Sequence, residues 1–128
     1  MKKFISLLLI IFMICGCSNN SIKKNEVGYM EIDAKTVFNE IDDKNVYIID
    51  VRENYEYESG HIKNAYNIPL NNLEDISKLM ISLDNKIIVY CHSGNRSRQA
   101  ANQLVEMGYT NVYDMGGITS WNYELIKE

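Results

Sequence analysis

The residues of this chain best suited to chemistry lie in one short segment, Cys91–Ser97, which reads Cys-His-Ser-Gly-Asn-Arg-Ser. The apolar run of residues 87–90 precedes it and predicts a buried strand that ends at the cysteine. A short loop containing Gly94 follows, and a helix is predicted to begin near Ser97. Amides of such a loop and of a first helical turn lack intrahelical acceptors and form an anion site, to which the helix dipole adds positive charge. The pattern therefore predicts a nucleophilic thiolate at Cys91 in a cradle for an anion.

Each residue of this segment also has a structural interpretation. Cys91 as an inert, packed strand-end thiol is the alternative to a nucleophile. Arg96 is expected either to clamp the oxygens of an anionic substrate or to bond loop carbonyls and hold the shape of the loop. Ser97 is a candidate donor to the sulfur, and helix capping explains it equally well. Gly94 is interpreted as a turn residue and His92 as a rim residue that tunes specificity.

Strand-like and helix-like segments alternate along the chain and must position this loop. The predicted strands are residues 28–32, 46–51, 65–68, 86–90 and 112–115. The predicted helices are residues 34–41, 53–59, 73–83 and 97–107, with a last helix after Gly117 carrying Trp121 and Leu125. This alternation predicts an α/β fold with a central, mainly parallel five-stranded sheet covered by helices on both faces. Ligands in such sheets bind at the carboxyl ends of strands, where Cys91 is expected.

The first residues are expected to be a targeting signal. Lys2 and Lys3 are followed by the apolar run Phe4–Ile14, which is too short to span a membrane, and by Cys15-Gly16-Cys17. This arrangement resembles a bacterial lipobox, with cleavage before Cys17 and a lipid on that cysteine. The predicted organisation is a signal peptide over 1–16, a flexible tether over 17–28 and one domain over 29–128. An uncleaved anchor or a plain signal peptide is the alternative.

Composition limits the classes of function. The chain has 17 acidic and 13 basic residues and a net charge of −4, which argues against nucleic-acid binding. An anionic substrate must therefore be attracted locally, and the candidates for a basic rim are Arg52, His61, Lys63, His92, Arg96 and Arg98. After cleavage and lipidation Cys91 would be the sole free thiol, which excludes an internal disulfide and a cysteine-based zinc site. We expect no cofactor and no metal.

Four segments, in order, give residues 29–126 a resemblance to a single rhodanese domain, a sulfurtransferase module. They are Asp50-Val51-Arg52-Glu53, Glu56–Ile62 with the following Ala65, Asn67, Ile68 and Pro69, the Cys91–Ser97 loop, and Gly116-Gly117 with Trp121. Asn64 departs from the family, which often carries glycine there, and Asn tolerates a left-handed backbone. The resemblance implies the fold described above and an anion-binding loop made of His92, Ser93, Gly94, Asn95, Arg96 and Ser97.

The resemblance also implies the chemistry and the supporting residues. Cys91 would take the outer sulfur of thiosulfate or of a persulfide and pass it to cyanide or a thiol, in two half reactions. Asp50 and Arg52 are expected to form a buried pair beneath the site, with Arg52 facing the anion as the alternative. His61 is expected to be structural. Tyrosine phosphatases have a similar loop with one more residue between Cys and Arg, so the shorter loop here favours sulfur transfer over phosphate chemistry.

Two other functions remain open at this stage. One is a domain that binds or senses a sulfane sulfur or an anion without turnover, although the intact cysteine argues against this alternative. A thiol redox partner is disfavoured because the chain lacks a resolving cysteine. The expected location is extracytoplasmic, with the chain bound to the cell membrane through the lipid on Cys17. The partners expected are a small anionic sulfur donor and an acceptor, whereas the sequence identifies no protein partner.

Overall fold

The computed structural model describes residues 28–128. Its strands are β1 (Met30–Glu31), β2 (Val46–Asp50), β3 (Tyr66–Asn67), β4 (Lys86–Cys91) and β5 (Val112–Gly117). Its helices are α1 (Ala34–Glu40), α2 (Asn54–Ser59), α3 (Asn95–Glu106) and two 3₁₀ segments, η1 (Leu70–Leu79) and η2 (Ile118–Ser120). The predicted signal peptide, its predicted cleavage site and Cys17 lie outside the described residues.

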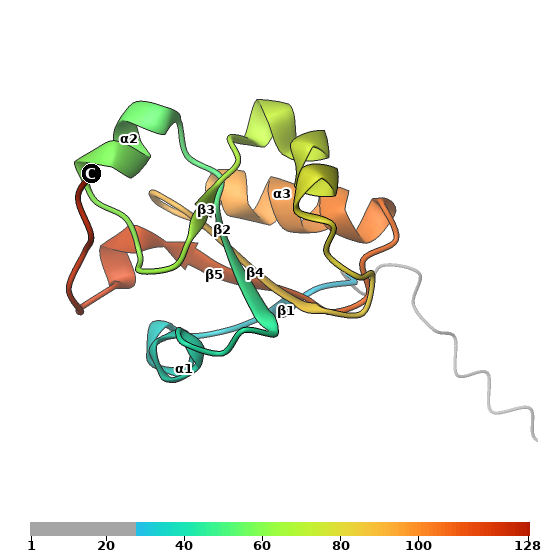
Figure 1. The fold of residues 1–128 in the computed structure, drawn as a ribbon, viewed down its shortest axis with the longest axis horizontal. Coiled ribbons are helices and arrows are strands. Elements are labelled where there is room, and N and C mark those ends of the chain that lie inside the picture. Colours follow the sequence, from blue (N-terminus) through green and yellow to red (C-terminus); the bar gives the residue numbers. More distant parts are fainter. Residues whose placement is uncertain (1–27) are drawn as a thin grey trace, which may run out of the picture.

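The five strands form one parallel sheet in the order β1-β5-β4-β2-β3. β4 is central and its neighbours β2 and β5 pair with it along most of its length. A parallel order of this kind requires crossover connections, which α1, α2, η1 and α3 supply (Figure 1). The predicted fold class is confirmed. Within residues 28–128, no helix has both the length and the apolar character needed to cross a membrane.

Each face of the sheet has its own apolar core, because alternate residues of a strand point to opposite faces. On one face Ile87, Val89 and Cys91 pack with Ala100 and Leu104 of α3 and with side chains of η1. On the other face the alternate β4 residues, Ile88 and Tyr90, pack with Val37 of α1 and with Trp121. Cys91 therefore lies on the face of the sheet that α3 covers, and α3 is the helix that begins directly after its loop.

Local signals in the sequence explain several element boundaries. Asp33 caps α1, because its Oδ1 accepts a hydrogen bond from the Thr36 amide at 2.7 Å. Asn64 has φ of 66°, so this residue does occupy the left-handed conformation that the sequence comparison suggested. Its Nδ2 donates to the Ile41 carbonyl at 2.9 Å, which ties the turn before β3 to the end of α1.

Two predicted helices differ from the structure. Residues 73–83 were expected to be a helix, but the segment is the 3₁₀ element Leu70–Leu79, with a kink at Asn72. Asparagine competes for backbone hydrogen bonds and disfavours a regular helix at that point. The last predicted helix reduces to Ile118–Ser120. Trp121 is extended after it, and Ile126 instead exchanges backbone hydrogen bonds with His61, which draws the end of the chain towards α2.

Candidate active site

The centre of the site is the sulfur of Cys91 at the carboxyl end of β4. The residue is 1% exposed, and the Gly94 amide donates a hydrogen bond to its Sγ at 3.0 Å. Gly94 has φ of 103°, a conformation that favours glycine and allows the loop to turn back on the sulfur. A buried strand end and a tight turn thus place one peptide amide directly against the thiol.

Helix α3 begins one residue after this turn, two residues earlier than predicted. The amides of Asn95, Arg96 and Ser97 form its first turn, and the first intrahelical acceptor is the Gly94 carbonyl, which accepts from Arg98 at 3.3 Å. Amides of a first turn and the positive end of the helix dipole stabilise negative charge on the sulfur or on a bound anion. The strand end, tight turn and helix start that the sequence pattern predicts around Cys91 are present, and anion binding by this cradle stays a prediction.

The hydroxyl of Ser97 has neither of the two partners considered from the sequence. Its Oγ donates to the Gly94 carbonyl at 3.1 Å, and the side chain is fully buried. Because the helix begins at Asn95, Ser97 lies in its first turn rather than at its cap. This hydrogen bond fixes the backbone of Gly94, the residue whose amide donates to the Cys91 sulfur. Ser97 therefore acts on the thiol through the loop backbone.

A second loop closes the cradle from the side of β5. A Cβ atom built at Gly117 would lie 2.4 Å from the His92 carbonyl oxygen and 2.9 Å from Ser93 Cα. Both neighbours are backbone atoms, so only glycine permits this approach. The resemblance included Gly117 without giving it a role. The structure shows that it lets β5 press directly against the first half of the loop.

Arg96 bonds a partner that the sequence did not suggest, the carboxylate of Glu56. Its Nη1 donates to Glu56 Oε2 at 2.7 Å and its Nη2 to Oε1 at 3.0 Å, in a two-pronged ion pair between α3 and α2. The same Glu56 oxygen, Oε2, accepts from the Glu53 amide at 2.9 Å. Sequence reasoning assigned no role to Glu56. Its only local signal is the spacing to Glu53, which forms a capping box at the start of α2.

The Glu56–Arg96 pair should make stability depend on pH. Hydrogen bonds from Arg96 lower the pKa of the Glu56 carboxyl from 4.5 to about 2, against an opposing effect of burial. A lowered folded-state pKa contributes stability that is present above the unfolded value and is lost as the pH falls through the folded value. We expect the wild type to lose about 1–3 kcal/mol more than Glu56→Gln between about pH 5 and about pH 2. Urea unfolding across that range measures the difference, and parallel curves would contradict the assignment.

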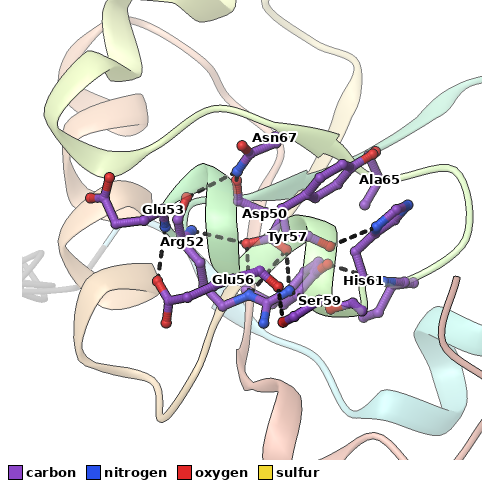
Figure 2. A network of polar contacts seen from close by, with 12 residues as sticks. Asp50, Arg52, Glu53, Glu56, Tyr57, Ser59, His61, Ala65 and Asn67 are labelled. Carbon is purple, nitrogen blue, oxygen red and sulfur yellow. Dashed lines mark hydrogen bonds and ion pairs between the residues drawn. The ribbon is translucent and has the colours of Figure 1, made fainter. Parts of the chain in front are cut away.

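Beneath the loop lies the expected buried pair of Asp50 and Arg52. The Arg52 Nη2 donates to Asp50 Oδ2 at 2.7 Å and to the Gly60 carbonyl at 2.7 Å, while its Nε contacts both carboxylate oxygens (Figure 2). The Asn67 amide group donates to the carbonyls of Asp50 and Arg52. With its guanidinium committed to these partners, Arg52 joins the end of β2 to α2 and β3 rather than offering an unpaired charge to a substrate.

His61 has the structural role expected of it. Its Nδ1 lies 2.9 Å from the Tyr57 carbonyl, and its ring stacks on the Tyr57 ring with centroids 3.7 Å apart (Figure 2). Lys63, a candidate for the basic rim, instead pairs with Asp42 at 3.0 Å. Both residues line a separate groove of about 880 Å³ with Tyr47 and Tyr66, so neither belongs to the cradle. Of the loop residues, His92, Ser93 and Asn95 are exposed.

Comparison with known proteins agrees with this architecture. Residues 33–124 match the family described as the Rhodanese-like domain. The chain is 34% identical over 91 residues to a putative mitochondrial thiosulfate sulfurtransferase of Schizosaccharomyces pombe, covering 62% of this chain and 63% of that protein. It is 34% identical over 113 residues to a tRNA uridine(34) hydroxylase of Erwinia tasmaniensis, covering 83% of this chain and 32% of that one.

Solved structures show the same likeness. A rhodanese-related protein from Thermoplasma volcanium aligns over 78% of this chain and all of its own, with a TM-score of 0.67 and 36% sequence identity. The chain therefore belongs to the rhodanese-like domain family. The two curated relatives differ in their named activities, and the chain spans less than two thirds of the length of each. Sulfurtransferases and related enzymes are thus the class that the family defines.

Proposed function

We propose that this protein is a sulfurtransferase that moves a sulfane sulfur from thiosulfate or a persulfide donor to a thiol or cyanide acceptor. The observation that carries the proposal is the hydrogen bond from the Gly94 amide to Cys91 Sγ at 3.0 Å, at the head of α3. Both a thiolate and a terminal persulfide sulfur are anions, so one cradle stabilises the enzyme before and after it accepts sulfur. The intact cysteine favours turnover over mere binding.

The reaction divides into two half reactions. The Cys91 thiolate attacks the outer sulfur of the donor, the bond to that sulfur breaks, and its electron pair leaves with sulfite or with a thiolate. Cys91 then carries a persulfide whose outer sulfur is attacked by the acceptor, and the electron pair of the S–S bond returns to Cys91. Free amides of the Asn95–Ser97 turn are placed to stabilise the charge that remains on sulfur throughout.

Initial-rate kinetics test this mechanism. With donor and cyanide varied together, a covalent intermediate predicts parallel double-reciprocal lines, because each substrate reacts with a different form of the enzyme. A domain that only binds or senses sulfane sulfur would take up label from the donor without acceptor-dependent release. Uptake without thiocyanate or persulfide product from cyanide or from any thiol tested would therefore refute catalytic turnover.

Gly117 should be essential for the geometry of the loop. We expect Gly117→Ala to slow sulfur loading of Cys91 by about a hundredfold, because the new Cβ would force the His92–Ser93 backbone away from the sulfur. Gly116→Ala is the matched control: its Cβ meets nothing within 4 Å, although its φ of 86° adds strain of about 1–2 kcal/mol. Rates of loading are compared at equal folded fraction, and equal losses in the two variants would contradict the steric argument.

We further propose that the chain is anchored outside the cytoplasm by a lipid on Cys17. The proposal rests on the order of basic, apolar and lipobox residues in the first part of the sequence. We expect Cys17→Ala to release the full-length protein from the membrane fraction of a bacterial host and to remove lipid from its N-terminal peptide. Cys15→Ala is the control and should stay lipidated. Equal fractionation of the two variants would contradict lipid attachment at Cys17.

A further inference from the structure

Two guanidinium groups close to the loop, those of Arg96 and Arg52, are each paired with an acid. Arg96 lies in the first turn of α3. Both of its terminal nitrogens donate to the Glu56 carboxylate, at 2.7 and 3.0 Å. Arg52, beneath the loop, is paired with the fully buried Asp50. The anion site is consequently built from backbone amides and a helix dipole, with no net charge from these two arginines. Such a site stabilises one negative charge on a bound anion well. It stabilises a second negative charge on the same anion less.

Glu56 itself is held in place and ionised. Its carboxylate also accepts the Glu53 amide at 2.9 Å, and its side chain is 19% exposed beside an Arg96 that is 31% exposed. Because its pKa is about 2, the carboxylate is charged at neutral pH. A second acid, Glu53, begins the same helix and is exposed to solvent. The side of the cradle formed by α2 is therefore acidic rather than basic.

We propose that Glu56 sets the charge selectivity of the site, so that a sulfur donor with one negative charge, such as a persulfide or a thiosulfonate, is preferred over doubly charged thiosulfate. This inference rests on the proposed sulfurtransferase function and concerns its donor. The carboxylate cancels the charge that Arg96 would otherwise offer to a sulfonate group and repels the second charge of thiosulfate. Glu56 acts through Arg96 and the local field, and has no part in the bond changes.

The chemistry is the same for each class of donor. The Cys91 thiolate forms a new bond to the outer sulfur, and the bond between that sulfur and the rest of the donor breaks. The electron pair leaves with a thiolate, a sulfinate or sulfite, according to whether the donor was a persulfide, a thiosulfonate or thiosulfate. No external oxidant or reductant is needed, and only the charge that must enter the cradle differs between the donors.

Thiosulfate and methanethiosulfonate provide a matched pair of probes, since each carries one transferable outer sulfur and they differ by one charge. The rate of Cys91 loading is measured by quenched-flow mass spectrometry on the soluble domain and divided by the rate of the same donor with free cysteine. In the wild type we expect this normalised rate to be about tenfold higher for methanethiosulfonate. In Glu56→Gln, where Arg96 keeps its charge, the ratio should shift by about tenfold towards thiosulfate.

Glu58→Gln is the matched control, because Glu58 is an exposed acid on the same helix that contacts Asn54 rather than Arg96. Its donor ratio should equal that of the wild type. A wild-type preference for thiosulfate, or the same shift in both variants, would overturn the inference while leaving sulfur transfer intact. Failure of both donors, and of a small-molecule persulfide, to load wild-type Cys91 would instead refute the proposed function. The wild-type ratio remains decisive even if Glu56→Gln folds poorly.

Discussion

Replacing Cys91 with serine should abolish sulfur transfer, with a loss of at least about a thousandfold in turnover. Serine keeps the size of the side chain and a group that can accept the Gly94 amide, so the cradle is expected to survive. What the variant lacks is a sulfur atom that can attack the donor and form a persulfide. Thiocyanate production from thiosulfate and cyanide measures the effect.

The control for this variant is Ser93→Ala, which changes an exposed hydroxyl on the same loop. We expect it to reduce turnover by much less than Cys91→Ser, since the loop offers its amides rather than its side chains to the anion. The urea midpoint of both variants should stay close to that of the wild type. Turnover that persists in Cys91→Ser would show that another group carries the sulfur.

Arg52→Met should cause a large loss of stability, about 3–5 kcal/mol in the free energy of unfolding. The arginine is almost entirely buried and makes hydrogen bonds to Asp50 and to the Gly60 carbonyl. Without it, the Asp50 carboxylate remains buried with no cation, and the Gly60 carbonyl loses its side-chain donor. Urea denaturation at neutral pH measures the change.

A double variant separates the effect of the buried charges on the free energy of unfolding from the effect of side-chain packing. Asp50→Asn combined with Arg52→Met removes both charges, so the loss of stability should be clearly smaller than the sum of the two single losses. Additive losses, or a cost below about 1 kcal/mol for Arg52→Met, would contradict the view that this pair holds β2, α2 and β3 together beneath the site.

The arrangement of β4, the loop and α3 follows from local signals. An apolar run long enough for a buried strand, a glycine at the turn and helical periodicity afterwards leave few alternatives, so Cys91 at a strand end in front of a helix was predictable. The buried pair of Asp50 and Arg52 was also accessible from the sequence. Its two members are close in the chain, in a segment whose apolar residues indicate burial.

The partner of Arg96 could not be predicted from the sequence in the same way. Glu56 lies 40 residues earlier in the chain, and only the packing of α2 beside α3 brings the two together. The sequence shows that arginine will find an acceptor, but several acids and carbonyls compete for it. The role of Gly117 depends likewise on the approach of β5 to the loop. Contacts between distant segments are thus the part of the site that required a structure.

The prediction of a last helix is wrong for a related reason. Trp121 and Leu125 have helical spacing, but tertiary contacts override this weak local preference. Trp121 packs against the core around Val37 and Ile88, while Ile126 pairs with the backbone of His61. These interactions stretch the chain across α2.

Intact-mass measurement of the soluble domain after brief exposure to a sulfur donor tests the central claim most directly. Cys91, whose sulfur accepts the Gly94 amide, should gain one sulfur atom, the addition should map to the peptide containing residues 91–97, and cyanide should remove it. Cys91→Ser should gain nothing under the same conditions. A wild-type domain that acquires no sulfur from thiosulfate, methanethiosulfonate or a small-molecule persulfide would contradict the proposed mechanism.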